Sequence, residues 1–275
     1  MRLARWVRRV VTGIVIAALA VAAAIFAFVW FAQERITYQP PRIAEAAPAG
    51  AGRVEYVASD GQPLYALVVG APERPARVLL AFHGNADIAP WLVPWAAEIV
   101  RRTGYVVVLA EYRGYNGLTG VPRADGIRLD ARAALAFVRS RFGTDARIAY
   151  YGHSLGTAVS AELAGESPPS VLILESPFTA AADMAALFGT PLARFAWRLF
   201  GRIPYDTRAC VQAMDVPVWV AHGDSDRLIP VRMGRAVFAA ARRPGELLIV
   251  PGGGHNGLAE SGGPVYWEWI ARALR

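Results

Sequence analysis

The sequence predicts an α/β domain with a mostly parallel central sheet flanked by helices, preceded by one membrane-spanning helix. Short continuous apolar runs alternate with longer helical segments over most of the 275 residues. Such alternation is typical of a parallel sheet that helices cover on both faces. The other two observations are a long uncharged apolar run near the N-terminus and a Gly-x-Ser-x-Gly pattern at 152–156, between a strand-like and a helix-like segment.

The N-terminal apolar run extends from Val10 to Phe31 and contains no charged residue. A transmembrane helix needs about 20 such residues. A cleaved signal peptide is the alternative, but its apolar part is usually about 7 to 15 residues long. The residues directly before Gln33 do not form a clean small-x-small cleavage pair either. We therefore expect an uncleaved anchor that places the protein in a bilayer.

The arginines around this run predict its orientation, because positive charge favours the cytoplasmic side. Glu34 and Arg35 nearly cancel after the run, whereas the residues before it carry Arg2, Arg5, Arg8 and Arg9. We expect a cytoplasmic N-terminus and an extracytoplasmic folded domain, periplasmic in a Gram-negative bacterium.

The rest of the chain divides into a linker and one folded domain. Residues 1–34 form the cytoplasmic tip and anchor, 35–52 a linker rich in proline and alanine, and 53–275 the α/β domain. An antiparallel pair at 54–57 and 64–69 opens the domain around the Asp60-Gly61 turn. Further strands are expected at 78–82, 105–109, 148–151, 171–174, 216–221 and 247–250, and helices at 91–102, 125–142, 157–164, 231–241 and 265–274.

Composition narrows the class of chemistry. The formal charge of +7 rests on 29 basic residues, all arginine, and no basic run with interleaved aromatic residues follows the N-terminus, so we expect no nucleic-acid partner. Cys210 is the single cysteine, and the four histidines lack ligand spacing. We therefore expect neither a disulfide nor a metal, and no cofactor.

The residues that directly follow the predicted strands carry the candidate chemistry, because ligands bind beyond the carboxyl ends of parallel strands. Ser154 lies in the Gly-x-Ser-x-Gly turn, where a serine hydroxyl stands clear of the fold at the start of a helix. Asp224 and Asp226 follow the strand at 216–221, and His255 follows the last strand. Serine, acid and histidine in this chain order predict a catalytic triad.

From about residue 53 onward the chain resembles the α/β-hydrolases, and most of all a membrane-anchored branch with depalmitoylating and lysophospholipid-cleaving members. The shared motifs are Phe82-His-Gly-Asn-Ala, Tyr112-Arg-Gly-Tyr115, Gly152-His-Ser-Leu-Gly156, Ser176-Pro-Phe-Thr179, His222-Gly-x-x-Asp226-x-x-Ile-Pro230 and His255-Asn256, with Ile36-Thr-Tyr-Gln-Pro40 behind the anchor. Asn116 and Asp87 stand where this branch usually has glycine.

The resemblance implies a role for each site residue. Ser154 is the nucleophile, His255 the general base and Asp226, rather than Asp224, the acid that orients it. The backbone amides of Asn85 and Leu155 form the oxyanion hole. Two other histidines, His83 and His222, are expected to fix loops, and Tyr112-Arg113 to brace the cleft wall.

The resemblance also places a small cap at about 177–213, above the site. Within it, Thr190 and Pro191 predict a helix start and Gly201 a helix end. This helix carries an arginine stripe of Arg194, Arg198 and Arg202 opposite an apolar face of Leu192, Phe195, Ala196, Leu199 and Phe200. Either the apolar face packs on the core, or the helix lies at a membrane surface.

The function that we expect is a membrane-anchored serine hydrolase that cleaves carboxylic esters or thioesters of lipids or acylated proteins through an acyl-enzyme. A serine aminopeptidase is one alternative, and it needs an acid for the substrate amine, for which Glu111, Glu175 and Asp87 are the candidates. A non-catalytic binding module on the same fold is the other.

Overall fold

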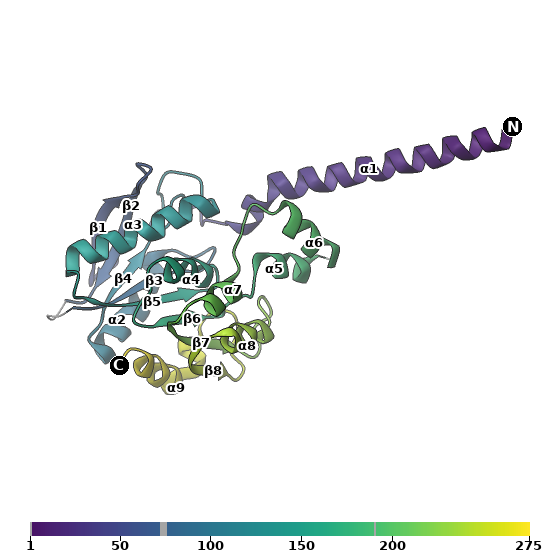
Figure 1. The fold of residues 1–275 in the computed structure, drawn as a ribbon. Helices are drawn as coiled ribbons and strands as arrows, with labels where there is room; N and C mark the ends of the chain where they lie inside the picture. The colour runs from purple at the N-terminus through teal and green to yellow at the C-terminus, as the bar shows by residue number, and fades with distance from the viewer. Residues whose placement is uncertain (1, 72–75, 190) are drawn as a thin grey trace.

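One mixed sheet organises the molecule in the computed structural model, which describes residues 2–71, 76–189 and 191–275 (Figure 1). Within these ranges the sheet has eight strands in the order β1-β2-β4-β3-β5-β6-β7-β8. β2 is antiparallel to both its neighbours, and the strands from β4 to β8 run parallel. The bounds are β1 Ala51–Val57, β2 Pro63–Val69, β3 Arg77–Phe82, β4 Val106–Ala110, β5 Arg147–His153, β6 Leu172–Glu175, β7 Pro217–Gly223 and β8 Arg243–Val250. The predicted mostly parallel sheet is confirmed.

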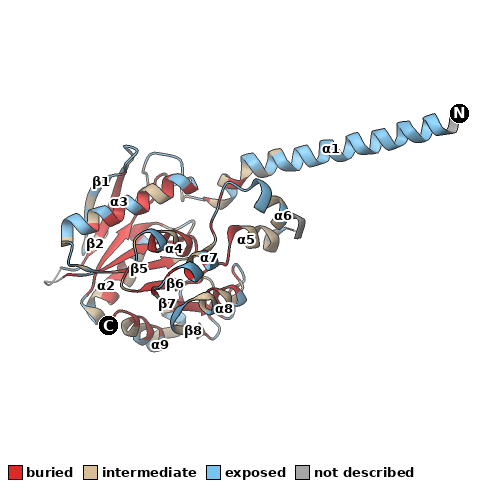
Figure 2. Cartoon of the chain, viewed as in Figure 1, coloured by how far each residue is buried: buried red, intermediate tan, exposed pale blue. Residues whose placement is uncertain are grey.

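Helices cover both faces of the sheet, which explains why the strands are apolar without alternation. One core lies under α3 (Ala124–Phe142), α4 (Leu155–Glu166), α7 (Thr207–Ala213) and α8 (Val231–Ala240). The other lies under α2 (Val93–Thr103), which follows the short helix η1 (Ala89–Leu92), and α9 (Leu258–Ala273). Figure 2 shows the strands buried between these layers. The helix expected at 265–274 is the second part of α9, beyond a kink at Gly263.

Helix α1 (Arg2–Thr37) projects away from the domain and is exposed along almost its whole length (Figures 1 and 2). The most apolar 18-residue window within Ala4–Thr37 has a mean hydropathy of 2.8, and within the described ranges no other helix has the length and composition needed to cross a membrane. The C-terminal third of α1 contacts the rest of the chain, where Phe26 packs edge-on against Phe200 at 4.9 Å.

Hydrogen bonds attach the segment that follows α1, within the linker expected at 35–52, to the domain. α1 continues through Thr37, and β1 already starts at Ala51. Between them Tyr38 is buried and its hydroxyl lies 2.9 Å from that of Tyr205. Asn116 exchanges two hydrogen bonds with the backbone of Glu45, at 2.7 and 3.0 Å. The segment has no periodic pattern in the sequence, because these contacts join residues far apart along the chain.

The expected cap contains the hairpin of α5 (Ala181–Phe188) and α6 (Pro191–Phe200), whereas α7 packs on α4 and α8 within the helical layer. Thr190, the expected helix start, lies outside the described residues. On α6, Phe195 and Leu199 are 61% and 57% exposed, so this apolar face is not packed on the core. Two arginines of the stripe form ion pairs, Arg194 with Asp183 at 2.7 Å and Arg202 with Glu34 at 3.0 Å.

Candidate active site

Ser154 occupies a sharp turn between β5 and α4, with φ 52° and ψ −115°. Few non-glycine residues adopt a positive φ, and such strain persists only where the surroundings hold it in place. The two glycines of the motif are required by close contacts. A Cβ on Gly152 would lie 2.2 Å from the carbonyl oxygen of Gly156, and one on Gly156 would lie 2.1 Å from that of Phe82. At the turn, the start of α4 therefore lies too close to β5 and to the end of β3 for a side chain at position 152 or 156.

Three residues from three strand ends meet at this turn. The Nε2 of His255 lies 2.9 Å from the Oγ of Ser154, and its Nδ1 lies 2.8 Å from the Oδ2 of Asp226. Ser154 follows β5, Asp226 follows β7 and His255 follows β8. The structure therefore brings together the three residues that the sequence predicted, in the geometry of a nucleophile, base and orienting acid.

Asp226 is held in its ionised form by its neighbours. Although burial opposes ionisation, hydrogen bonds from His222, His255 and the amide of Ile229 lower the pKa of Asp226 below its usual range. Its Oδ1 also accepts the amide of Leu228 at 2.8 Å. The rival Asp224 is exposed and accepts the amide of Gly252 at 2.7 Å, in the turn beside β8.

His222 contacts the acid of the site. It is fully buried, and its Nε2 lies 2.8 Å from the carbonyl oxygen of Ile229 and 3.3 Å from the Oδ2 of Asp226. The sequence predicted a loop-fixing role for His222. It did not predict that His222 would fix the loop that carries Asp226.

The two expected oxyanion amides lie at the same turn. Leu155 is the first residue of α4, and the loop of Gly84 and Asn85 passes over the serine, because a Cβ on Gly84 would lie 3.4 Å from that of Ser154. Within the described part of the chain, neither the amide of Leu155 nor that of Asn85 donates a hydrogen bond to another residue. Both donors are therefore available to a ligand.

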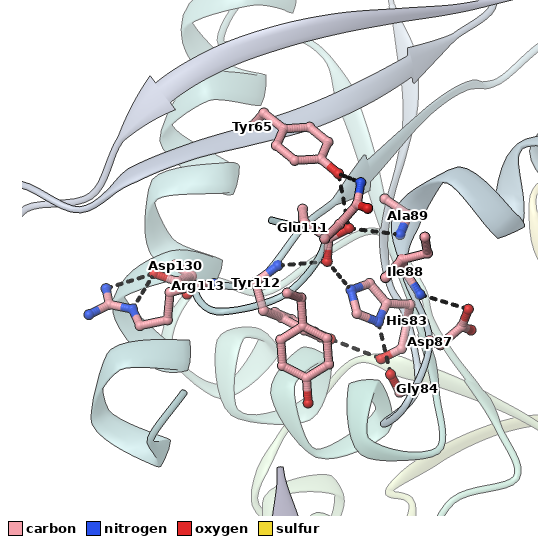
Figure 3. Close-up of polar contacts among 12 residues, drawn as sticks. Tyr65, His83, Gly84, Asp87, Ile88, Ala89, Glu111, Tyr112, Arg113 and Asp130 are labelled. Carbon is pink, nitrogen blue, oxygen red and sulfur yellow. Dashed lines mark hydrogen bonds and ion pairs between the residues drawn. The ribbon is translucent and has the colours of Figure 1, made fainter. Parts of the chain in front are cut away.

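A buried network holds the loop that carries Asn85 (Figure 3). The Nε2 of His83 lies 2.7 Å from the Oε1 of Glu111, and its Nδ1 lies 2.8 Å from the carbonyl oxygen of Gly84. Burial alone would lower the pKa of His83, but the Glu111 carboxylate raises it above its ordinary value. A protonated ring donates through both nitrogens. In a trans peptide the carbonyl and the amide point in opposite directions, so turning the oxygen of Gly84 toward His83 turns the amide of Asn85 away from it.

The sequence missed two residues that hold His255. The carbonyl oxygen of His255 accepts a hydrogen bond from the Nε2 of His153 at 3.1 Å and another from the Oγ of Ser176 at 3.2 Å. His153 and Ser176 lie in shared motifs, so their positions were visible, but their partner is about 80 to 100 residues away and no local signal identifies it.

Arg113 is occupied by two carboxylates, which agrees with a bracing role. Its guanidinium binds Asp130 of α3 at 2.7 Å and Asp60 of the β1–β2 turn at 2.6 Å. The departure at Asn116 also has a structural reason. Asn116 has φ 42°, a conformation that asparagine tolerates better than most residues, and its side chain holds the segment after the anchor.

Comparisons with known proteins agree with this architecture. The family model described as "Serine aminopeptidase, S33" matches residues 73–209. An uncharacterized Mycobacterium tuberculosis protein is 34% identical over 92% of this chain and 91% of its own length. The alpha/beta hydrolase domain-containing protein WAV2 of Arabidopsis thaliana is 30% identical over 93% and 89%. The human alpha/beta hydrolase domain-containing protein 17B is 28% identical over 78% and 70%.

Solved structures share the fold at low sequence identity. The Pyrococcus furiosus esterase Pf2001 superposes with a TM-score of 0.68 at 16% identity, covering 86% of this chain and 100% of its own. The acetyl xylan esterase from Paenibacillus sp. R4 gives 0.63 at 19% identity, covering 89% and 98%. With relatives of at least 30% identity over most of both chains and a serine elbow on a mostly parallel sheet, this chain belongs to the α/β-hydrolase family.

Proposed function

We propose that the protein is a serine hydrolase that cleaves carboxylic esters or thioesters through an acyl-enzyme. The observation that carries the proposal is the continuous chain of hydrogen-bonding distances from Ser154 through His255 to Asp226, beside two backbone amides with no partner among the described residues. This arrangement supports acyl transfer, which needs a nucleophile, a base and donors for an oxyanion.

The reaction has two halves. The Ser154 oxygen attacks the acyl carbon while His255 removes the proton of its hydroxyl. The negative charge moves to the substrate carbonyl oxygen, which accepts hydrogen bonds from the backbone amides of Leu155 and Asn85. The bond to the leaving oxygen or sulfur then breaks, and His255 returns the proton to it. Water repeats these steps on the acyl-enzyme and releases the acid. Asp226 stays ionised and stabilises the imidazolium.

The substrate class is proposed from the anchor. α1 is apolar and exposed, which costs free energy in water, so a bilayer is the medium that suits it. We place residues 53–275 beside this bilayer as the catalytic domain, where lipids and acylated proteins are the acyl compounds at hand. The names of the structural neighbours, which include esterases, support ester cleavage.

The test is covalent labelling with a fluorophosphonate, which reacts with activated serines. The full-length protein should be labelled once, at Ser154, and Ser154→Ala should abolish labelling without changing its thermal unfolding. Hydrolysis of acyl esters of graded chain length should disappear in the same variant. Labelling that survives in Ser154→Ala would overturn the proposal, and an unlabelled wild-type protein would favour a non-catalytic binding module.

A serine aminopeptidase is the second candidate, favoured by the description of the matching family model. Two of the three acids that could hold a substrate amine are already occupied. Glu111 is fully buried and bound to His83, and Glu175 accepts the hydroxyl of Tyr266 at 2.6 Å. Asp87 remains, and burial raises the pKa of Asp87, which disfavours the charge that an amine needs. Faster turnover of aminoacyl anilides than of acyl esters would reverse this order.

A further inference from the structure

A cavity with a volume of about 1090 Å³ lies at the C-terminal end of α1. It is open to solvent on one side and is lined by the end of α1, the segment after it, the loop before α3 and Arg202, which follows α6. Segments separated by well over a hundred residues thus meet at one place, beside the helix that we place in the bilayer.

Arginine dominates the charge of this cavity. Arg35, Arg42, Arg123 and Arg202 line it, and Glu34 is the one acidic residue among the lining residues. The Glu34 carboxylate is shared by Arg202 at 3.0 Å and Arg123 at 3.4 Å. Among the described residues neither Arg35 nor Arg42 has a carboxylate partner. The lining therefore carries an excess of three positive charges, two of them on unpaired guanidinium groups.

We propose that this cavity binds the phosphate headgroup of an anionic membrane lipid. The planar guanidinium fork matches phosphate oxygens with paired hydrogen bonds, so several convergent arginines form a phosphate site. The rim suits the rest of a lipid, because Phe31 and Val121 are 76% and 64% exposed. Its place at the end of α1 puts the site at the level of the headgroups.

Hydrogen bonds also connect the cavity to the loop that carries Asn85, called the oxyanion loop below because its backbone amide is one of the two proposed oxyanion donors. Gln39 lines the cavity, and its backbone amide donates to the Oδ1 of Asn85 at 2.8 Å. The Nδ2 of Asn85 donates to the carbonyl oxygen of Thr37 at 2.6 Å. A headgroup that binds residues 37–42 therefore also stabilises the loop that carries Asn85, whose backbone amide is a proposed oxyanion donor. This consequence rests on the proposed function, whereas the lipid site does not.

The test is a binding measurement on the full-length protein in a neutral detergent. A short-chain phosphatidylglycerol is titrated by calorimetry into the wild-type protein, Arg35→Gln/Arg42→Gln and a control, Arg139→Gln/Arg141→Gln. The control removes two exposed arginines at the other end of the 19-residue α3, about 28 Å from the loop that lines the cavity. Each arginine near an anionic surface contributes about 1 kcal/mol, so we expect about 30-fold weaker binding in the first variant.

The lipid and a free anion are distinguished in the same titrations. Inorganic phosphate should bind at least tenfold more weakly than phosphatidylglycerol, and equal binding would overturn the assignment to a lipid. Equal affinity of the wild-type protein and Arg35→Gln/Arg42→Gln would overturn the site itself. Fluorophosphonate labelling of Ser154 in each protein reports separately on the proposed hydrolase, so the two proposals fail independently.

Discussion

At the scale of single residues, the site depends on charges held in place by backbone donors and buried partners. Asp226 accepts two amides of its own loop and contacts two histidines, one of which, His255, faces the serine. The amide donors and the histidines keep its charge in a partly enclosed position, where an isolated carboxylate would tend to be protonated. The carboxylate can then hold His255 in the one tautomer and orientation that accepts the proton of Ser154.

Asp226→Asn tests this arrangement. The amide is the same size but carries no charge, so the imidazolium is no longer stabilised and the tautomer of His255 is no longer enforced. We expect kcat for ester hydrolysis to fall by about 10⁴. Asp224→Asn is the matched control and should retain wild-type kcat, because Asp224 is exposed and its carboxylate accepts the amide of Gly252, which an asparagine side chain can also accept. A comparable loss in Asp224→Asn would assign the acid to that residue.

The buried pair of His83 and Glu111 makes stability depend on pH in a defined direction. Because the pKa of His83 is raised on folding, the pair contributes stability that is fully present below the unfolded value of about 6.5 and is lost as the pH rises through the folded value. Glu111→Gln removes the charge that raises this pKa. We expect a loss of about 3 to 5 kcal/mol near neutral pH and a flatter decline of stability above it.

Urea unfolding at a series of pH values from about 6 to 9 measures this effect. Glu98→Gln is the control, because Glu98 pairs with Arg101 and Arg102 of its own helix, and its pKa is lowered to about 2, far below this window. The same pH slope in Glu111→Gln and the wild-type protein would contradict the assignment of the charge to His83.

At the scale of elements, the helices α4 and α6 differ in how far they are buried. α4 is buried along most of its length and starts so close to the ends of β5 and β3 that glycine is needed on both sides of Ser154. α6 contacts the base of α1 and presents an exposed apolar face. Phe195 and Leu199 lie one turn apart on this face, continuous with the apolar surface of the anchor through the contact of Phe200 with Phe26.

Phe195→Ser/Leu199→Ser tests whether this face contacts lipid. Amphipathic helices at a bilayer bury their apolar side among the headgroups and acyl chains. We expect the variant to hydrolyse an acyl substrate in vesicles several-fold more slowly and a short soluble ester at the wild-type rate. Val57→Ser/Val265→Ser is the control, since it removes two equally exposed apolar residues from the domain surface. If both substrates slow together in the α6 variant, the face serves the structure of the cap and not the membrane.

At the scale of the whole molecule, the anchor and the domain form one connected unit. α1 passes directly into a segment that is bonded to the oxyanion loop and to the loop after β4, so the domain does not swing freely on a tether. If α1 spans a bilayer as proposed, this attachment fixes the distance between the site and the membrane. It also predicts that activity depends on the residues just after the anchor.

Topology is the prediction that belongs to this scale. With arginines concentrated before α1, we expect the catalytic domain outside the cytoplasm. A C-terminal alkaline phosphatase fusion in bacterial cells should be active, and a fluorescent protein that folds only in the cytoplasm should stay dark. The same fusions on a chain without residues 1–37 should give the opposite pattern. A fluorescent full-length fusion would refute this orientation and leave the chemistry unchanged.

The sequence by itself determined the sheet, its flanking helices and the residues at the strand ends. These features depend on local patterns, because an apolar run of a few residues specifies a buried strand and parallel strands end at a common edge. The Gly-His-Ser-Leu-Gly turn could be recognised from its local pattern, although one of the contacts that require its glycines is with Phe82 on another strand. The approach of Ser154, Asp226 and His255 therefore followed from their positions after β5, β7 and β8.

Only the tertiary structure decided which distant residues support that site. Asn116 holds Glu45 across 71 positions, and Asn85 holds Thr37 across 48. The support of His255 by Ser176, and the convergence of four arginines at the foot of α1, likewise join loops from different elements. Such contacts depend on where each loop arrives after the sheet has formed, and a hydrogen bond between side chain and backbone leaves no periodic pattern in the sequence by which to foresee it.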